Sequence, residues 1–158
     1  MNKKLAVAIA IVLILGIIAY YQYQKATAVK NLEIGLAEIT ASEFTLTSFK
    51  LGITFNIHNP NKMDVTIGRF TAKTFANNVQ IAEITLPDKI KLASGITAQE
   101  AVSIRINYLD AGIAVFEAIK NKKATWQVKG KYEMELPLGI IYPFAFDVQK
   151  TWSPNSQQ

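Results

Sequence analysis

Hydrophobic and polar residues alternate without a break along residues 49–58, FKLGITFNIH. The five odd-numbered positions are Phe, Leu, Ile, Phe and Ile, whereas the even-numbered positions are Lys, Gly, Thr, Asn and His. This period of two predicts a β-strand with one face in a core and the other toward solvent. We expect Asn59, Pro60 and Asn61 to end the strand in a turn, because proline lacks the N–H that strand pairing needs and asparagine side chains bond to nearby backbone.

Six further segments alternate in the same way or contain a short apolar run, and turn residues separate them. They are residues 32–37, 65–75, 79–86, 101–108, 126–136 and 141–148. Asn77 and Asn78 predict a tight hairpin, Gly68 predicts a bulge, and we expect residues 43–46 to prolong the 49–58 strand backwards. About seven short strands separated by turns predict a mainly β fold, an antiparallel β-sandwich of the immunoglobulin or fibronectin type III kind.

One stretch changes to the period of a helix. Its apolar residues follow at intervals of three or four and are Leu109, Ile113, Phe116 and Ile119. This spacing predicts one short amphipathic helix over residues 110–120, with those side chains inward and Asp110 as its N-cap. Lys120, Lys122 and Lys123 suit the negative end of the helix, and we expect them to contact anionic lipid headgroups where that end faces a bilayer.

The N-terminal part has the composition of a membrane span. Seventeen residues, Leu5–Tyr21, carry no charge, and twenty uncharged residues separate Lys4 from Lys25. A helix of that length is about 25–30 Å long, close to the hydrocarbon thickness of a bilayer. We therefore predict a single transmembrane helix with tyrosines at the interface and lysines beyond it. The expected anchor residues are Lys4, Leu5, Gly16, Tyr20, Tyr21, Tyr23 and Lys25.

A cleaved signal peptide is the alternative for the same segment. A basic start, an apolar core and the Ala-Thr-Ala at 26–28 fit that pattern, so retention or cleavage of residues 1–28 stays open. Lys3 and Lys4, together with the N-terminal amine, favour an N-terminus on the inside. We therefore expect a single-pass membrane protein whose domain lies on the outer side, in a periplasm, an extracellular space or the equivalent.

Composition narrows the function classes. The chain has 158 residues and no cysteine, which excludes disulfides, thiolate metal sites and a cysteine nucleophile. Four lysines and no acid lie in residues 1–30, whereas residues 31–158 carry thirteen basic and twelve acidic side chains. The net charge of +5 therefore does not indicate nucleic-acid binding, which needs a basic face on the folded domain. The predicted parts are a basic segment (1–4), the transmembrane helix (5–24), a connector (25–31), the sandwich (32–150) and a polar tail (151–158).

The polar residues offer little chemistry. His58, the single histidine, makes only a weak triad candidate with Ser48 and Asp64, because the sequence lacks a nucleophile elbow. Asp64 could join Asn59 and Asn61 as oxygen ligands, but their spacing is not that of a calcium loop. We expect no catalytic residue, no metal, no cofactor and no small-molecule substrate.

Motifs in a fixed order make the chain resemble the late-embryogenesis-abundant type 2 proteins, also called the water-stress-and-hypersensitive-response (WHy) domain. The motifs are His58–Asn61, Val65–Ile67, Asn77-Asn78, Leu86-Pro87, Val102–Ile106, Trp126–Gly130, Leu136–Gly139 and Pro143-Phe144. The resemblance covers about residues 32–148 and departs at Asn78, where the family usually has glycine. It implies a β-sandwich with one helix, often with an N-terminal anchor, and a non-enzymatic role in desiccation and stress protection.

Two functions follow as expectations. The first is a non-enzymatic, membrane-anchored β-sandwich with a structural or stress-protective role at the membrane surface, with the lipid bilayer as its partner. The alternative is a structural subunit of a larger membrane assembly, such as an envelope complex or a membrane-containing virion. That subunit would bind a protein or its own copy through the sandwich edges, expected at 32–37 and at 141–148, where Pro143 argues for an edge. Ala6 and Ala10 could also let two anchor helices approach.

Overall fold

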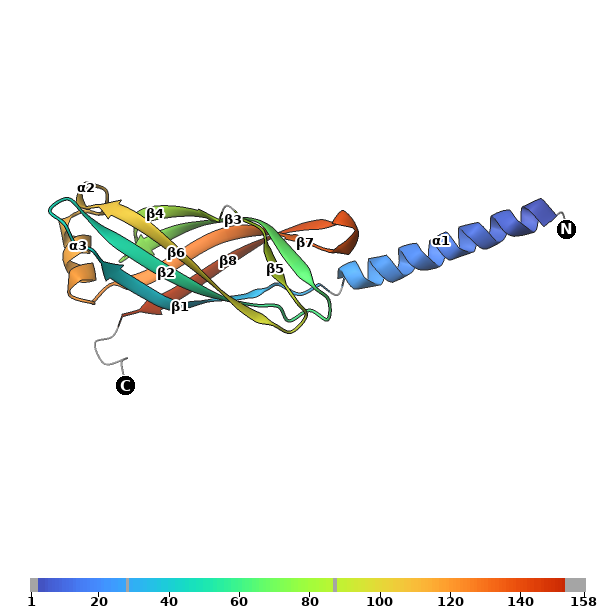
Figure 1. The fold of residues 1–158 in the computed structure, drawn as a ribbon, viewed down its shortest axis with the longest axis horizontal. Coiled ribbons are helices and arrows are strands. Elements are labelled where there is room, and N and C mark those ends of the chain that lie inside the picture. Colours follow the sequence, from blue (N-terminus) through green and yellow to red (C-terminus); the bar gives the residue numbers. More distant parts are fainter. Residues whose placement is uncertain (1–2, 28, 87, 153–158) are drawn as a thin grey trace. The chain divides into compact units, whose positions relative to one another are not determined.

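The structure is a computed structural model, and it describes residues 3–27, 29–86 and 88–152. The chain forms two compact units, Met1–Lys30 and Asn31–Gln158. Helix α1 (Lys3–Thr27) belongs to the first unit and all the strands belong to the second (Figure 1). Three sequence-based assignments lie outside the described residues: Ala28 of the cleavage pattern, Pro87 of the family motif and residues 153–158 of the polar tail.

The expected N-terminal helix is present, but the prediction of a transmembrane span is wrong. Within the residues that the structure describes, no helix combines the length and the hydropathy that a membrane crossing requires. The twenty uncharged residues between Lys4 and Lys25 end in Tyr-Tyr-Gln-Tyr-Gln, so the strongly apolar part is Leu5–Ala19, which at 1.5 Å per residue reaches about 22 Å, short of a hydrocarbon core of about 30 Å. The side chains of Lys4 and Lys25, which were to flank the span, are not among those described.

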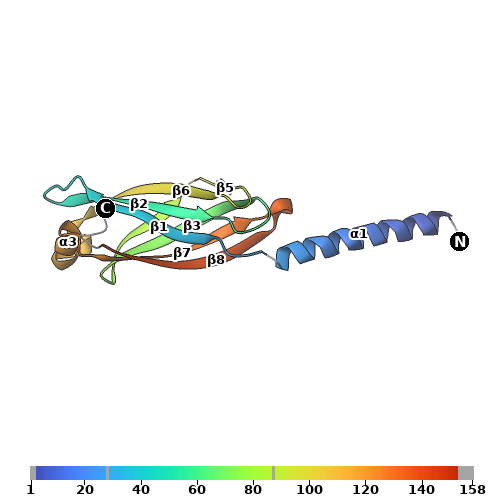
Figure 2. The ribbon, with the colours of Figure 1, turned by 90° about the horizontal axis from the view of Figure 1, so that it is seen from below.

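The second unit is a sandwich of two antiparallel sheets, seen from two sides in Figures 1 and 2. The first sheet has the order β1 (Glu33–Ser42), β2 (Ser48–His58), β6 (Thr97–Asn107). The second has the order β4 (Val79–Leu86), β3 (Val65–Ala76), β7 (Thr125–Glu135), β8 (Ile141–Thr151), with β5 (Ile90–Leu92) paired to the start of β3. The predicted two-sheet architecture is therefore correct, with eight strands rather than about seven.

Strand β2 is central to the first sheet, as its alternation predicts. The five apolar side chains from Phe49 to Ile57 are at most 1% exposed, whereas those between them are half-buried. Phe55 meets Phe70 of the other sheet edge to face, with ring centroids 5.4 Å apart. On the far side of the core, burial raises the pKa of Tyr132, whose hydroxyl accepts a hydrogen bond from Leu32 N at 2.9 Å.

The predicted turn and bulge are confirmed. Asn77 and Asn78 both have positive φ, 48° and 66°, which a two-residue hairpin between twisted strands requires. The pairing of β3 with β7 shifts register between Ile67 and Arg69, which places the bulge at Gly68. A three-residue 3-10 turn, η1 (Pro137–Gly139), connects β7 to β8.

The predicted single helix is instead two short ones, α2 (Tyr108–Ala111) and α3 (Ile113–Lys120). Gly112 separates them with φ 79° and ψ 151°, which breaks the helical phase, so Asp110 lies inside α2 and does not cap α3. Ala111 and Ile119 are buried, but the predicted core residues Leu109 and Ile113 are 97% and 78% exposed. The spacing of the apolar residues misleads here, because Gly112 interrupts the helix over which that spacing would hold.

Two other assignments need correction. Residues 43–47 do not prolong β2; they form the connection from β1 to β2, in which Glu43 has a φ of 49°. Its carboxylate bonds to Lys50 and Arg105 at 2.9 and 2.8 Å, and Lys50 first and then Arg105 hold the pKa of Glu43 below its usual value. Strand β5 has no counterpart in the sequence-based assignment, because three residues are too few to show a period.

Three of the edge strands, β1, β6 and β8, carry features that hinder pairing with another chain. The pairing of β1 with β2 shifts register between Leu36 and Glu38, and Lys150 Nζ donates a hydrogen bond to the Ala37 carbonyl at 2.5 Å. Strand β6 places Glu100 opposite Phe55, on the core-facing side. Strand β8 contains Pro143, which has no N–H. A bulge, an inward charge and a proline are recognised protections of an open edge.

Candidate functional site

The Asn-Pro-Asn turn is a buried junction, not the surface turn that its residues suggest. Asn59 is fully buried and Asn61 is 5% exposed. The side-chain amide of Asn59 donates to the carbonyls of Met63, Leu92 and Ala93 at 2.9, 3.2 and 3.1 Å. Its carbonyl oxygen accepts from both the backbone N and the side-chain Nδ2 of Asn61, each at 3.0 Å.

Backbone bonds complete this junction. Asn59 N donates to Ile96 O, and Gly95 N donates to Asn59 O, each at 3.0 Å. Ser94 donates from its hydroxyl to Asn61 O at 2.8 Å and from its backbone N to the Asp64 carboxylate at 2.9 Å. The turn after β2 is thereby tied to the connection between β5 and β6, so the role of this motif is to join the two sheets at one end.

The triad candidate does not assemble. Ser48 and His58 begin and end β2, and ten residues of strand separate them by about 33 Å. His58 Nδ1 lies 2.9 Å from Thr97 Oγ1 on the outer face, and Asp64 is engaged with Ser94. The side-chain oxygen of Asn59 is likewise used inside the junction, which removes it as a calcium ligand. In the part of the chain that the structure describes, no group of three His, Cys, Asp or Glu side chains is placed to hold a metal.

The end of the sandwich opposite the Asn59 junction exposes aromatic and aliphatic side chains. We call it the sandwich tip, and it comprises residues 43–47, α2 and α3, which lie together in Figure 1. Its base is a cluster of four aromatic rings, Phe44, Phe49, Tyr108 and Phe116, with neighbouring centroids 4.1–6.4 Å apart. Tyr108 fixes the segment 43–47: its hydroxyl donates to Thr45 O and Ser48 O at 2.7 and 2.9 Å, and its backbone N donates to Thr47 O at 3.0 Å.

Aliphatic side chains project from this rigid base. Leu46 is 98% exposed, Leu109 97% and Ile113 78%. Three exposed lysines, Lys120, Lys122 and Lys123, follow at the end of α3; Lys120 Nζ lies 6.0 Å from the centroid of the Phe116 ring. These are the lysines for which headgroup contact was predicted, and that prediction stays open.

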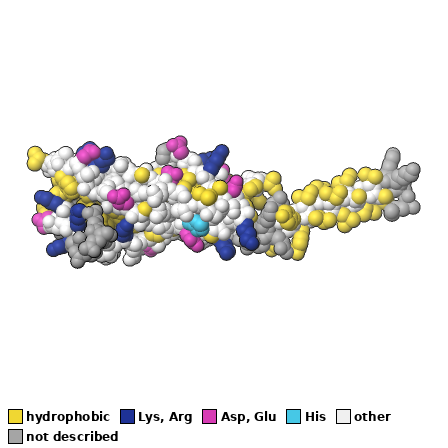
Figure 3. Space-filling model, turned by 60° about the horizontal axis from the view of Figure 1, so that its bottom comes forward, with side chains coloured by type: hydrophobic (Ala, Val, Ile, Leu, Met, Phe, Trp, Pro, Cys, Tyr) yellow, Lys and Arg dark blue, Asp and Glu magenta, His cyan; other side chains and the backbone are white. Residues whose placement is uncertain are grey.

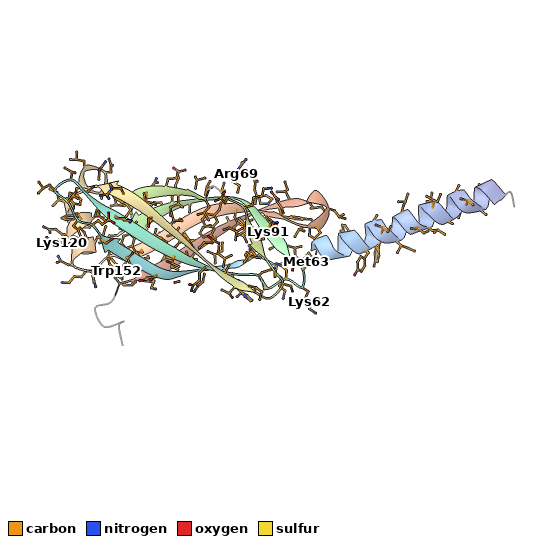
Figure 4. All side chains as sticks on the ribbon, in the orientation of Figure 1. Lys62, Met63, Arg69, Lys91, Lys120 and Trp152 are labelled. Carbon is orange, nitrogen blue, oxygen red and sulfur yellow. The ribbon has the colours of Figure 1, made fainter. Side chains whose placement is uncertain are left out.

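A cavity of about 360 Å³ adjoins the tip along β1. The described residues that line it are Ala37–Ala41, Phe44, Ile119, Lys120, Lys122, Lys150 and Trp152. Trp152 packs edge to face on buried Trp126, with centroids 5.5 Å apart. Figure 4 labels Lys120 and Trp152 at this end, and Lys62 and Met63 at the junction end. A second hollow, of about 460 Å³, lies beside Asp64 and η1.

Comparison with known families gives the affiliation. The model of the LEA_2 family, described as late embryogenesis abundant protein, matches residues 54–149. The chain belongs to the LEA_2 family. The match begins inside β2 and ends near the end of β8, so it contains the junction, both helices of the tip and all of the second sheet except the last two residues of β8. Among curated proteins, none matches the sequence of this LEA_2 chain significantly.

Solved structures resemble this LEA_2 protein at low sequence identity. A protein from Archaeoglobus fulgidus is 14% identical, with 78% of this chain and 98% of that chain covered and a TM-score of 0.46. The putative ApaA protein from Bordetella pertussis is 12% identical, with 81% and 99% covered and a TM-score of 0.49. A protein of Arabidopsis thaliana is 12% identical, with 78% and 85% covered and a TM-score of 0.43.

Two features of the LEA_2 domain escaped the sequence-based reasoning. The partners of Asn59 lie about thirty residues ahead in the chain, and no local pattern links them. Leu109 and Ile113 were assigned to the core by spacing alone; the signal that places them at the surface is Gly112, which makes a positive φ available between them.

Proposed function

We propose that this LEA_2 protein is a non-enzymatic β-sandwich of the WHy kind, with a structural or stress-protective role at a membrane surface. The proposal is carried by one observation: the polar side chains that were candidates for a site form hydrogen bonds within the fold. Asn59 and Asn61 join the two sheets, Asp64 holds Ser94, and His58 contacts Thr97 on an outer face. Each of these four side chains, which were candidates for a catalytic or metal site, is engaged in a bond within the fold.

The charged side chains support the same proposal. Glu133 pairs with Arg69 at 3.5 Å and Glu135 with Lys89 at 2.7 Å; both carboxylates are half-buried and their basic partners are exposed. Each of these carboxylates is thus held in an ion pair with a basic side chain. Membership of the LEA_2 family adds the association with stress.

We also propose that the domain lies on the outer side of a membrane. The support is the N-terminal segment, in which a basic start and a long apolar run have the composition of an export signal. Protease added to intact cells or organelles should then digest the Asn31–Gln158 unit without detergent. Protection from the protease until detergent is added would contradict this location.

A structural subunit of a larger membrane assembly is the second candidate. The observation that favours it is the 360 Å³ cavity along β1, where an open strand edge lies beside Trp152. The bond from Lys150 to Ala37 O would have to break for a partner strand to pair there. In-situ crosslinking with mass spectrometry separates the candidates: one dominant partner linked near β1 supports the assembly, and scattered weak links support an autonomous domain.

Protection assays test the main proposal. The full chain would be added to dye-loaded vesicles and to a freeze-labile enzyme before freeze–thaw or drying, with albumin at equal mass as the control. We expect vesicles to retain more dye, and the enzyme more activity, with the LEA_2 protein than with albumin. Equal retention in both assays would refute the stress-protective role.

A further inference from the structure

We propose that the sandwich tip is a lipid-docking surface that inserts Leu46, Leu109 and Ile113 into the interface of an anionic bilayer. The proposal rests on the function proposed above, because it names the surface through which the domain meets the membrane. Large aliphatic side chains that are 78–98% exposed are costly in water unless something covers them. All three project from one end of the sandwich.

The tip holds these side chains in a fixed arrangement. Leu46 lies between Thr45 and Thr47, both of which are bonded to Tyr108. Leu109 directly follows that tyrosine, so the two leucines project from adjoining segments that share a bonded base. Because the aromatic cluster beneath them is already packed, insertion would not require the tip to refold.

The charged side chains around the tip indicate that the membrane it binds is anionic. Lys120, Lys122 and Lys123 lie at the end of α3, and Figure 3 shows basic side chains beside hydrophobic ones at this end of the sandwich. The carboxylate of Glu43 is neutralised by two basic partners, whereas Asp110 and Glu117 remain as exposed acids. With Lys50, Arg105, and the Lys150 and Glu38 that line the adjoining cavity, six basic side chains oppose four acidic ones. Apolar side chains surrounded by net positive charge are typical of interfacial binding to anionic lipid.

The shape of the tip favours lipid over a protein partner. A stable protein interface buries about 800 Å² on each partner across a packed and complementary surface. The three aliphatic side chains instead project separately from a loop and two short helices, and none of them lines the 360 Å³ cavity along β1. A bilayer interface accepts isolated projecting side chains because acyl chains adapt to them.

The chain has no cysteine, so single-cysteine variants give a site-specific test in the full-length protein. An environment-sensitive dye would be attached to Leu46→Cys or Leu109→Cys. The matched control is Ile96→Cys, an aliphatic residue that is 54% exposed beside the Asn59 junction at the other end. Each protein would be titrated with vesicles of phosphatidylcholine alone or with added phosphatidylserine. Because each signal comes from one position, binding through α1 does not obscure it.

We expect the emission from positions 46 and 109 to rise and shift to the blue only with the anionic vesicles, while position 96 stays unchanged. Lys120→Gln should raise the lipid concentration at the midpoint about fivefold, the effect of removing one basic side chain near an anionic surface. No shift at 46 and 109, or equal shifts at all three positions, would overturn the proposal. A shift without lipid that grows with protein concentration would also overturn it, because the tip would then bind a second copy.

The dye titration and the protection assays test the docking surface and the proposed function separately. If the tip does not insert but the protein still protects vesicles, the docking surface is refuted and the protective role is supported. A tip that inserts in a protein no better than albumin refutes the protective role and leaves the docking surface standing.

Discussion

Asn59 is the side chain whose replacement tests the architecture most directly. In Asn59→Ala, the carbonyls of Met63, Leu92 and Ala93 lose a donor, and the two donors of Asn61 lose their acceptor. A buried polar group left unpaired costs about 1–3 kcal/mol. The bond to Leu92 is fully buried, whereas those to Met63 and Ala93 are partly buried, where water can replace the lost donor.

These contributions place the expected loss at about 3–5 kcal/mol, a large part of the 5–15 kcal/mol that stabilises a typical domain. The assay is urea unfolding followed by tryptophan fluorescence, which reports on Trp126, fully buried in the second sheet, and on Trp152, packed against it. Asn59→Asp should cost more at neutral pH, because a carboxylate cannot donate and would face three carbonyl oxygens.

Asn56→Ala is the matched control for this experiment. Asn56 lies on the half-buried outer face of β2 and accepts one bond from Gln99 at 3.0 Å, so its loss should cost less than about 1 kcal/mol. Losses for Asn59→Ala and Asn56→Ala that agree within about 0.5 kcal/mol would refute the junction, because they would show that the buried bonds contribute no more than a surface one.

Three further predictions use the same unfolding assay. Phe55→Ala should cost about 3–5 kcal/mol and His58→Ala under about 1; equal losses would contradict the placement of Phe55 in the core and His58 outside it. Gly112→Ala should cost about 1–3 kcal/mol, because φ 79° with ψ 151° suits only glycine; an unchanged midpoint would show that this backbone conformation is not needed. The pKa of Glu43 is lowered in the folded state, so the stability that its carboxylate contributes is present above the usual pKa of 4.5 and is lost as the pH falls through the lowered pKa. The small difference in unfolding free energy between wild type and Glu43→Gln should therefore vanish in acid. A difference that grew in acid would contradict the pairing of Glu43 with Lys50.

The strands were predictable because their signal is local. Residues 49–58 alternate over ten positions, and a slip of one residue would expose all five apolar side chains, so the pattern allows one register. The Asn77-Asn78 hairpin was predictable for a related reason, since the preference of asparagine for positive φ is a property of the residue itself.

The remaining features depend on information that is not local. The assignment of Leu109 and Ile113 to a buried face failed because Gly112 resets the helical phase, and β5 is too short to show a period. The junction needs Asn59 to meet carbonyls that β3 and β5 bring together only after folding. Lack of charge over residues 5–24 does not by itself make a membrane span, because a crossing also needs sustained hydropathy, which no helix among the described residues has over the required length.

The protected edges have a consequence for a cell that loses water. Drying concentrates every protein, and β-rich proteins are then most prone to join strand to strand into fibrils. The displaced register of β1, the inward Glu100 of β6 and Pro143 of β8 each oppose that joining in the folded state, with no need for a chaperone. Three of the domain's strand edges are therefore unfavourable for such joining at any protein concentration at which the domain stays folded.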